Sequence, residues 1–553
     1  MITHIRIQNL RSLVDTGFIE IKPLTILLGA NSSGKSTFLR SFPLFTQSVS
    51  KSLREPISWF DDAYVDFGDF DTAKSKMSNE DDGIVVSYKI KSPFYLSPEY
   101  YFLGRRNPEY IITNPDLIIP GSEVSLSFVK DKHGTFINRV SIKNKNIAID
   151  FKIKDREAIV EMYVNGESVM EDSKWKWHHG SKRSLIPEFE SQRKTDEIYY
   201  RVETWIYDNA FAVLYKYCTK QLRKIERLWP IIRNWTEDKI AFLDTLQKVR
   251  IATLKNRAKT WTIESEEFKE VYNNLALFYA IRNLGVIDDE IKSMYTSCSY
   301  IAPVRAAANR YYRTQGLQVR DVDPYGKNLQ EFISSLSGNR EKSYRDFTKR
   351  VLGLQVMVQN KAGHQQIILK NEYRENNMTD VGFGYSQILP IITKLWYSRY
   401  RLLDDKNNFY YKKNYVSDIM LIEQPELHLH PAMQARIADI MMLVLNDIDI
   451  NVNEQQEQDD LFLLRQKYSS SLIVETHSQA MINRIGKRIR EKRFSADNVS
   501  ILLFEKDQET GVTSIRPITY NENGQLTNWP YGFFEPTDDY DILFDRQSQN
   551  KGK

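Results

Sequence analysis

The nine residues GANSSGKST, at positions 29–37, combine residue types and spacings suited to phosphate binding. Gly29 and Gly34 are separated by four residues, and Lys35 and Ser36 follow directly. Glycines let backbone N–H groups surround a phosphate, the lysine reaches the β- and γ-phosphates, and the serine hydroxyl ligates Mg²⁺. A chance Gly/Ser-rich turn is the alternative, but the apolar run LTILLGA precedes the loop and the helix-like FLRSFPLF follows it. The residues expected to contact ATP are Gly29, Asn31, Ser32, Ser33, Gly34, Lys35, Ser36 and Thr37.

A second group of candidate residues follows the apolar stretch DIMLIE, which ends at Glu423. A carboxylate at such a strand end can hold Mg²⁺ through water, so Ser36 and Glu423 are the predicted metal residues. The next residue is Gln424, where nucleotidases usually carry a second carboxylate that activates water. Glutamine can hold a water molecule but cannot take its proton. Without a general base, the rate of hydrolysis is expected to be about 10²–10⁴-fold lower. Glu426 is an alternative base, although it belongs to the following loop, so slow ATP hydrolysis is predicted.

The stretch SLIVETHSQAMINRI, residues 471–485, predicts a further buried strand followed by a helix. His477 comes just after the strand end, where an imidazole can touch the γ-phosphate and report its presence. A lone histidine is often only structural, but the position of His477 after the acidic strand favours the sensor role. Ligands from several strand ends are expected to meet at one edge of an open α/β sheet.

A family resemblance rests on these motifs and on four further stretches. They are YVDFGDF (64–70), YIAPVRAAANRYY (300–312), VGFGYSQILP (381–390) and WPYGFF (529–534). The chain resembles the OLD/SMC-like ABC ATPases of bacterial defence, above all the PtuA-type ATPase of Septu systems and some retrons. The similarity covers about residues 1–75 and 298–536. It implies an α/β fold: an ABC/SMC-type P-loop NTPase head with an antiparallel β subdomain and an inserted helical region.

The resemblance also implies partners. Such ATPases form a homodimer or higher oligomer through heads that enclose ATP, and Gly384, Ser386 and Gln387 match the signature that faces the other copy's γ-phosphate. The helix after this signature is expected to begin near Gln387. The family implies an HNH nuclease partner and, in retron versions, a reverse transcriptase with its RNA–DNA hybrid. One alternative function is an SMC/RecF-like ATPase that clamps or repairs DNA. A second is a scaffold in which ATP is structural, with neither turnover nor DNA contact.

Four segments are expected. They are 1–75, the N-terminal half of the head; 76–189, an antiparallel β subdomain; 190–297, a helical insertion; and 298–553, the C-terminal half of the head. Alternating stretches within 83–169, with the turns DKHG and NGE, predict antiparallel strands. Pro230 and the shortness of the helical runs argue against a long coiled coil. Residues 498–520 predict a C-terminal hairpin.

Two basic segments are candidates for nucleic-acid contact. KWKWHHGSKR, residues 174–183, interleaves aromatic and basic residues in an expected loop, although tryptophan is more usually core or interface. Residues 220–260 carry 11 Lys/Arg against 4 Asp/Glu. A solvated helix surface explains that excess equally well.

Bulk composition limits the remaining function classes. With 41% hydrophobic residues and a formal charge of +4 over 553 residues, any nucleic-acid surface must be a local patch. The two cysteines, the missing signal-peptide pattern and the absence of a long apolar stretch predict a cytoplasmic protein without membrane association. The late acidic cluster TDDYDILFD (537–545) leaves no room for a Toprim sheet, so no nuclease site is expected in this chain.

Overall fold

The computed structural model describes residues 2–51, 53–91, 122–153, 160–170, 175–178, 185–186, 188–191, 210–219, 225–313, 319, 321–361, 363–404, 416–453 and 468–529. Its central element is a seven-stranded sheet, with strands in the order β13, β18, β19, β4, β20, β21, β22. The first five strands run parallel to one another. Strand β21 pairs antiparallel with β20, and β22 pairs antiparallel with β21. The bounds are β13 Cys298–Ile301, β18 Val416–Glu423, β19 Tyr468–Glu475, β4 Leu24–Gly29, β20 Val499–Lys506, β21 Thr513–Tyr520 and β22 Leu526–Thr527.

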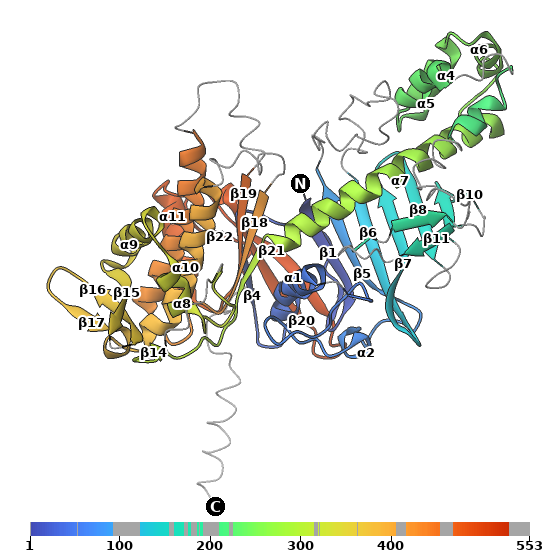
Figure 1. The fold of residues 1–553 in the computed structure, drawn as a ribbon. Coiled ribbons are helices and arrows are strands. Elements are labelled where there is room, and N and C mark those ends of the chain that lie inside the picture. The colour runs from blue at the N-terminus through green and yellow to red at the C-terminus, as the bar shows by residue number, and fades with distance from the viewer. Residues whose placement is uncertain are drawn as a thin grey trace, which may run out of the picture.

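Both faces of this sheet are buried, which explains why its parallel strands read as apolar runs. Alternate residues of each strand point to opposite faces, so Ile422 and Val474 join one core while Leu421 and Ile473 join the other. The first face is covered by α10 (Phe383–Asp404), α11 (Pro431–Asn453) and α13 (Gln479–Arg490). The second face packs on α1 (Lys35–Ser50), which Figure 1 shows between the two large sheets of the molecule. This α/β arrangement confirms the predicted fold class, and the predicted C-terminal hairpin is formed by β20 and β21.

The second large sheet is nine-stranded and antiparallel, in the order β10, β9, β8, β7, β6, β5, β1, β2, with β3 also paired to β1. Its strands are β1 Ile2–Leu10, β2 Leu13–Asp15, β3 Ile19–Glu20, β5 Ile84–Ile90, β6 Glu123–Asp131, β7 Gly134–Lys143, β8 Ala148–Ile153, β9 Val160–Val164 and β10 Glu167–Met170. The predicted strands of the β subdomain are therefore formed. Asn165 (φ 53°) and Gly166 (φ 85°) make the two-residue turn that joins β9 to β10, because both central residues of such a turn need positive φ. Strands β1–β3 belong to the same sheet, so it continues across position 75.

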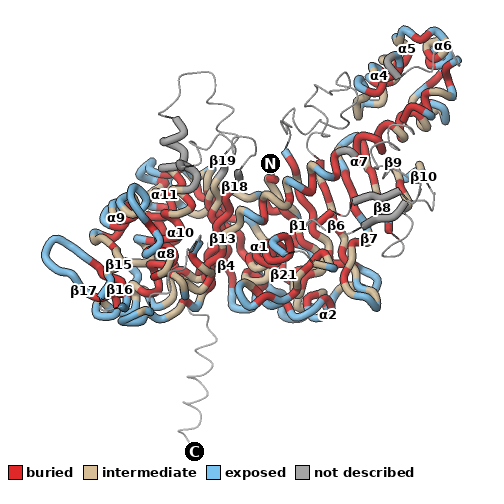
Figure 2. Tube along the Cα trace, viewed as in Figure 1, coloured by how far each residue is buried: buried red, intermediate tan, exposed pale blue. Residues whose placement is uncertain are grey.

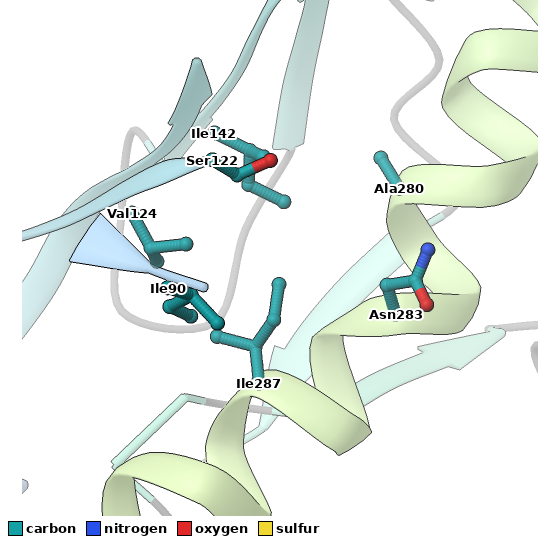
Figure 3. Close-up of a pocket in the computed structure, with 7 residues that line it drawn as sticks. All are labelled: Ile90, Ser122, Val124, Ile142, Ala280, Asn283 and Ile287. Atoms are coloured by element: carbon teal, nitrogen blue, oxygen red, sulfur yellow. The ribbon is translucent and has the colours of Figure 1, made fainter. Parts of the chain in front are cut away.

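Helix α7 (Glu266–Thr296) is 31 residues long, although the sequence predicted only short helices in this region. It runs diagonally over the nine-stranded sheet towards α4 (Ile225–Arg233), α5 (Lys239–Lys248) and α6 (Ala252–Ala258) (Figure 1). The length was missed because apolar residues occupy several sides of α7, so a single amphipathic stripe is absent. Figure 3 shows Ala280, Asn283 and Ile287 of α7 facing Ile90 and Val124 across a gap of about 10 Å³. That volume is barely enough for one water, so the gap is a packing defect rather than a ligand site.

A smaller lobe lies beside the seven-stranded sheet. It contains α8 (Leu329–Ser335), α9 (Asn339–Leu352) and the four-stranded sheet of β14 (Tyr312–Arg313), β15 (Gln355–Lys361), β16 (His364–Lys370) and β17 (Glu375–Asn377). Buried residues concentrate along the two large sheets and α1, whereas the hairpin tips of this lobe are exposed (Figure 2).

A further sequence prediction is wrong for residues that the structure describes. Trp175–His178, expected in a loop, forms strand β11 and pairs with β12 (Glu188–Ser191). The alternating order Trp-Lys-Trp-His is itself typical of a strand. The rest of 174–183, residues 220–224 and the acidic cluster 537–545 lie outside the described residues. Within the described part of the chain, no helix combines the length and apolar character needed to cross a membrane.

Candidate nucleotide-binding site

The loop between β4 and α1 has the backbone shape of a phosphate cradle. Gly29 has a φ of 150°, and a Cβ there would lie 2.3 Å from the carbonyl oxygen of Phe504. Gly34 has a φ of 98° and caps α1, which begins at Lys35. Both glycines are therefore required by geometry, and the N–H groups at the start of α1 point into the loop, where they favour an anion.

Lys35 is buried at the bottom of the loop. Its Nζ donates to the carbonyl oxygens of Gly29 (3.1 Å) and Ala30 (2.6 Å) and lies 3.9 Å from Glu475 Oε1. Burial lowers the pKa of Lys35, with Glu475 and Glu426 opposing the effect. The ammonium thus sits among oxygen atoms at the position where a phosphate is expected.

Strand β21 holds the loop from the other side. The Thr513 hydroxyl donates to the carbonyl oxygen of Ser33 (3.0 Å) and lies 3.0 Å from the Ser12 hydroxyl. The Thr513 N–H also donates to the Ser12 carbonyl oxygen (3.1 Å). The conformation of the phosphate loop therefore depends on the C-terminal hairpin.

Two carboxylates end neighbouring strands at the same level, since Glu423 of β18 pairs in register with Glu475 of β19. The Ser36 hydroxyl donates to Glu475 Oε1 (2.8 Å). Glu423 instead accepts two hydrogen bonds from Arg40 (both 2.8 Å) and one from the Tyr300 hydroxyl (2.8 Å). Burial and the nearby Glu423 carboxylate raise the pKa of Glu475 to about 7.

The predicted catalytic residues lie on the two loops that follow these strands. Gln424 has a φ of 42°, and its N–H donates to the Glu475 carbonyl oxygen (2.8 Å). Glu426 accepts from the His477 N–H (2.6 Å) and from the Thr476 hydroxyl (2.8 Å), so the two loops are tied together. Burial lowers the pKa of His477, with Lys35 adding to the effect, so the imidazole is neutral at pH 7.

An open cavity of about 390 Å³ lies over the loop. Among the described residues, buried polar atoms without a hydrogen-bond partner include Ser33 Oγ, Glu475 Oε2 and His477 Nε2. The Ser33 hydroxyl and His477 Nε2, when that nitrogen carries the ring proton, can donate to oxygen atoms of a ligand, whereas Glu475 Oε2 can accept from a donor or bind a cation. The cavity is lined by Arg11, Ser12, Asn31, Ser32, Ser33, Gly34, Lys35, Ser36, Thr37, Gln424, Glu475 and Lys506.

The signature residues lie away from this cavity. Helix α10 begins at Phe383 rather than near Gln387, because Gly382 (φ 112°) breaks the chain direction one residue earlier. Gly384 and Ser386 are therefore inside the first turns, and Ser386 Oγ donates to the Phe383 carbonyl oxygen (2.6 Å). Gln387 is buried against the Arg305 carbonyl oxygen.

Several residues of the site were missed by the sequence motifs. Glu475 was recognised only as the end of a strand, although its register with Glu423 could have been inferred from the two strand patterns. Arg40 lies on α1 one turn after Ser36, at a spacing that places both on one helix face. Arg11, Lys506 and Thr513 come from the turn after β1 and from strands β20 and β21, and only the tertiary fold brings them together.

Comparisons with known proteins show the family of the chain. A family model described as AAA ATPase domain matches residues 1–482, and one described as a protein of unknown function (DUF3696) matches residues 495–545. No curated protein matches the chain.

Similar solved structures include two heads with low identity. One is the Smc head domain with an extended coiled coil bound to the C-terminal domain of ScpA, derived from Pyrococcus furiosus (11% identity, 94% of this chain and 96% of that chain, TM-score 0.30). Another is the SMC head domain from Thermotoga maritima (9% identity, 93% of this chain and 98% of that chain, TM-score 0.31). At these TM-scores the family rests on the sequence model, which spans most of the chain. The chain belongs to the AAA ATPase domain family.

Proposed function

We propose that this ATPase binds ATP with Mg²⁺ over the phosphate loop and hydrolyses it slowly. The observation that carries the proposal is Gln424, which lines the cavity at the position where a general base is expected. An amide can orient the attacking water but cannot accept its proton. Glu426 does not replace it directly, because both of its oxygens accept hydrogen bonds from the loop after β19.

The residues present fit the triphosphate and its metal. Backbone N–H groups of residues 29–37 and the Lys35 ammonium would hold the phosphates, and the neutral His477 imidazole would contact the γ-phosphate. The Ser36 hydroxyl would hold Mg²⁺ together with a strand-end carboxylate, either the predicted Glu423 or its neighbour Glu475. The metal, when bound, neutralises charge on the β- and γ-phosphate oxygens.

The signature on α10 supports ATP-dependent association of two heads. Gly384, Ser386 and Gln387 are absent from the lining of the cavity in their own chain, so we propose that the start of α10 faces the γ-phosphate held by a second copy. Gln387 is buried against the Arg305 carbonyl oxygen and would support this helix start from behind rather than touch the phosphate. Gly384 has helical backbone and its Cβ position is 3.3 Å from Leu429 Cδ2, so only small groups fit there. A Gly384→Lys variant should bind ATP normally but stay monomeric when light scattering is measured with Mg²⁺ and ATP.

We further propose that the paired heads hold or license an HNH-type nuclease in an anti-phage defence complex. A retron reverse transcriptase with its RNA–DNA hybrid is a further candidate component. This step rests on the resemblance in the motifs of residues 1–75 and 298–536. The exposed basic residues Arg227, Arg250 and Lys259 at the far end of α7 are available for nucleic acid or a partner.

The test is purification of the tagged chain from its native host with its neighbouring genes, with and without ATP. Co-elution of a stoichiometric small nuclease, with or without a reverse transcriptase and its hybrid, would support the defence complex. A chain that elutes alone or with random duplex DNA, and whose ATP turnover is stimulated by that DNA, would favour a DNA-clamping ATPase instead. Salt-sensitive affinity for bare duplex would point the same way.

A further inference from the structure

We propose that Glu475, rather than Glu423, is the carboxylate that completes the magnesium site with Ser36. The inference deepens the proposed function and rests on it, since it assigns a role within the same nucleotide site. It reverses the assignment that the strand-end motif alone would give.

The strand order places Glu475 nearer to the phosphate loop. Strand β19 lies between β18 and β4, and Glu475 pairs in register with Leu27, just before the loop. Glu423 is at the same level one strand further away. Because neighbouring strands are about 4.8 Å apart, Glu423 starts about twice as far from β4 as Glu475 does.

The contacts of Glu475 are those of an incomplete site. Its Oε1 accepts from the Ser36 hydroxyl at 2.8 Å, and Lys35 Nζ is 3.9 Å away. Only 2% of Glu475 is exposed, and its buried Oε2 has no hydrogen-bond partner among the described residues. Glu475 lines the cavity, so this unsatisfied oxygen belongs to a group beside the open space.

Glu423 is already satisfied. Arg40 donates from Nε to Oε1 and from Nη2 to Oε2, each at 2.8 Å, and the Tyr300 hydroxyl donates to Oε1 at 2.8 Å. Its negative charge is therefore neutralised by a bidentate guanidinium. Glu423 is not among the residues lining the cavity, and a metal would have to displace Arg40 to reach it.

The chemistry of Mg²⁺ suits the Ser36–Glu475 pair. Magnesium prefers oxygen ligands and is commonly held by one or two carboxylates, substrate phosphates and water. A hydroxyl and a carboxylate that touch each other at the start of α1 supply the protein share of that set. Among the described residues no cluster of three or more His, Cys, Asp or Glu side chains is placed to hold a metal, so the phosphates must complete the set.

The test is calorimetric titration of the full chain with a non-hydrolysable ATP analogue, with and without Mg²⁺. Wild type should bind more tightly with Mg²⁺. The magnesium gain is the ratio of the affinities that one variant shows with and without Mg²⁺. Glu475→Gln should lose at least about tenfold of this gain, whereas Glu423→Gln should keep it. Electron paramagnetic resonance of Mn²⁺ added with the analogue should show the same order, with bound Mn²⁺ reduced only in Glu475→Gln.

If Glu423→Gln lost the magnesium gain and Glu475→Gln kept it, the assignment of Glu475 would be overturned. The proposed ATP-binding function would not be affected by that result. Failure of wild type to bind the analogue at all would remove the proposed function as well. If Glu423→Gln does not fold, the pair Arg40→Gln/Glu423→Gln serves as the control, because it removes both members of the ion pair together.

Discussion

Arg40 and Glu423 form a bidentate ion pair that joins the first helix after the phosphate loop to a strand 383 residues later in the chain. Glu423 is 2% exposed, whereas 37% of the Arg40 side chain is exposed. The pair therefore connects α1 to β18 at the edge of the nucleotide site, and the buried carboxylate depends on its partner for neutralisation.

Replacing Arg40 by Met should leave the Glu423 charge buried without its bidentate partner, with the Tyr300 hydroxyl and the buried Arg305 guanidinium remaining nearby. The free energy of unfolding should fall by about 2–4 kcal/mol, less than the roughly 3–5 kcal/mol for breaking a fully buried pair, because Arg40 is partly exposed. Urea unfolding monitored by tryptophan fluorescence measures the change. The double variant Arg40→Met/Glu423→Gln should recover most of the lost stability. If the stability losses of the two single variants simply added in the double variant, the two residues would not stabilise the fold as a pair.

Replacing Gln424 by Glu should raise the rate of ATP turnover by about tenfold or more, because it restores a carboxylate able to take the proton of the attacking water. Single-turnover release of phosphate is the measurement. Gln424→Asn is the matched control, since it keeps an amide and should give no gain. Equal rates in wild type and Gln424→Glu would show that proton removal is not what limits hydrolysis.

Replacing Thr513 by Val keeps the shape of the side chain but removes the hydrogen bond to the Ser33 carbonyl oxygen. Nucleotide affinity should fall about three- to tenfold, because the loop must keep its shape to bind and the variant loses the free energy of one hydrogen bond. Thr519→Val, on the same strand, removes the exposed hydroxyl pair with Thr527 and should leave affinity unchanged. Equal affinities in the two variants would mean that β21 does not support the loop.

Asp439 of α11 accepts hydrogen bonds from Arg484 and Arg488 of α13. Partial burial raises the pKa of Asp439, but hydrogen bonds from Arg488 and Arg484 outweigh it, so its net pKa is below the usual value. A carboxyl whose folded-state pKa is lowered stabilises the fold above its unfolded pKa of about 3.9, and this contribution is lost as pH falls through the folded pKa.

Asp439→Asn should therefore lower the free energy of unfolding by about 1–2 kcal/mol at pH 7, with the difference from wild type shrinking below about pH 4. Chemical denaturation at a series of pH values measures this. Asp244→Asn, which breaks an exposed pair with Lys248, is the control and should change stability by less than about 0.5 kcal/mol. A difference that grew as pH fell would contradict the assigned sign.

The phosphate loop and the hairpins could be predicted from sequence because each depends on local chemistry. Gly29 and Gly34 are needed for backbone angles within the loop, and Asn165-Gly166 is needed for its turn, whatever surrounds them. The same holds for the strand that ends at Glu423, which is buried on both faces and so consists mainly of apolar residues.

The tertiary partners could not be predicted in this way. Arg40 contacts Glu423, and Glu475 contacts Ser36, because β19 is inserted between β18 and β4, and a strand order is not written in any one strand. Likewise, β1–β3 fall within the segment predicted as part of the head, but β1 pairs with β2, β3 and β5, so all three strands belong to the other sheet. Local pattern identified the elements, and long-range pairing decided what they touch.

The position of β4 between β19 and β20 also determines when the site can form during protein synthesis. The phosphate loop leaves the ribosome early, but its flanking strands end only at Glu475 and Lys506. At about 5–20 residues per second, the interval is on the order of half a minute or longer. Throughout that time the apolar strand Leu24–Gly29, fully buried in the native fold, has no neighbours on either side. Nascent chains of this ATPase should therefore depend on chaperones until β19 and β20 have been synthesised, and fragments that stop before β19 should aggregate rather than bind nucleotide.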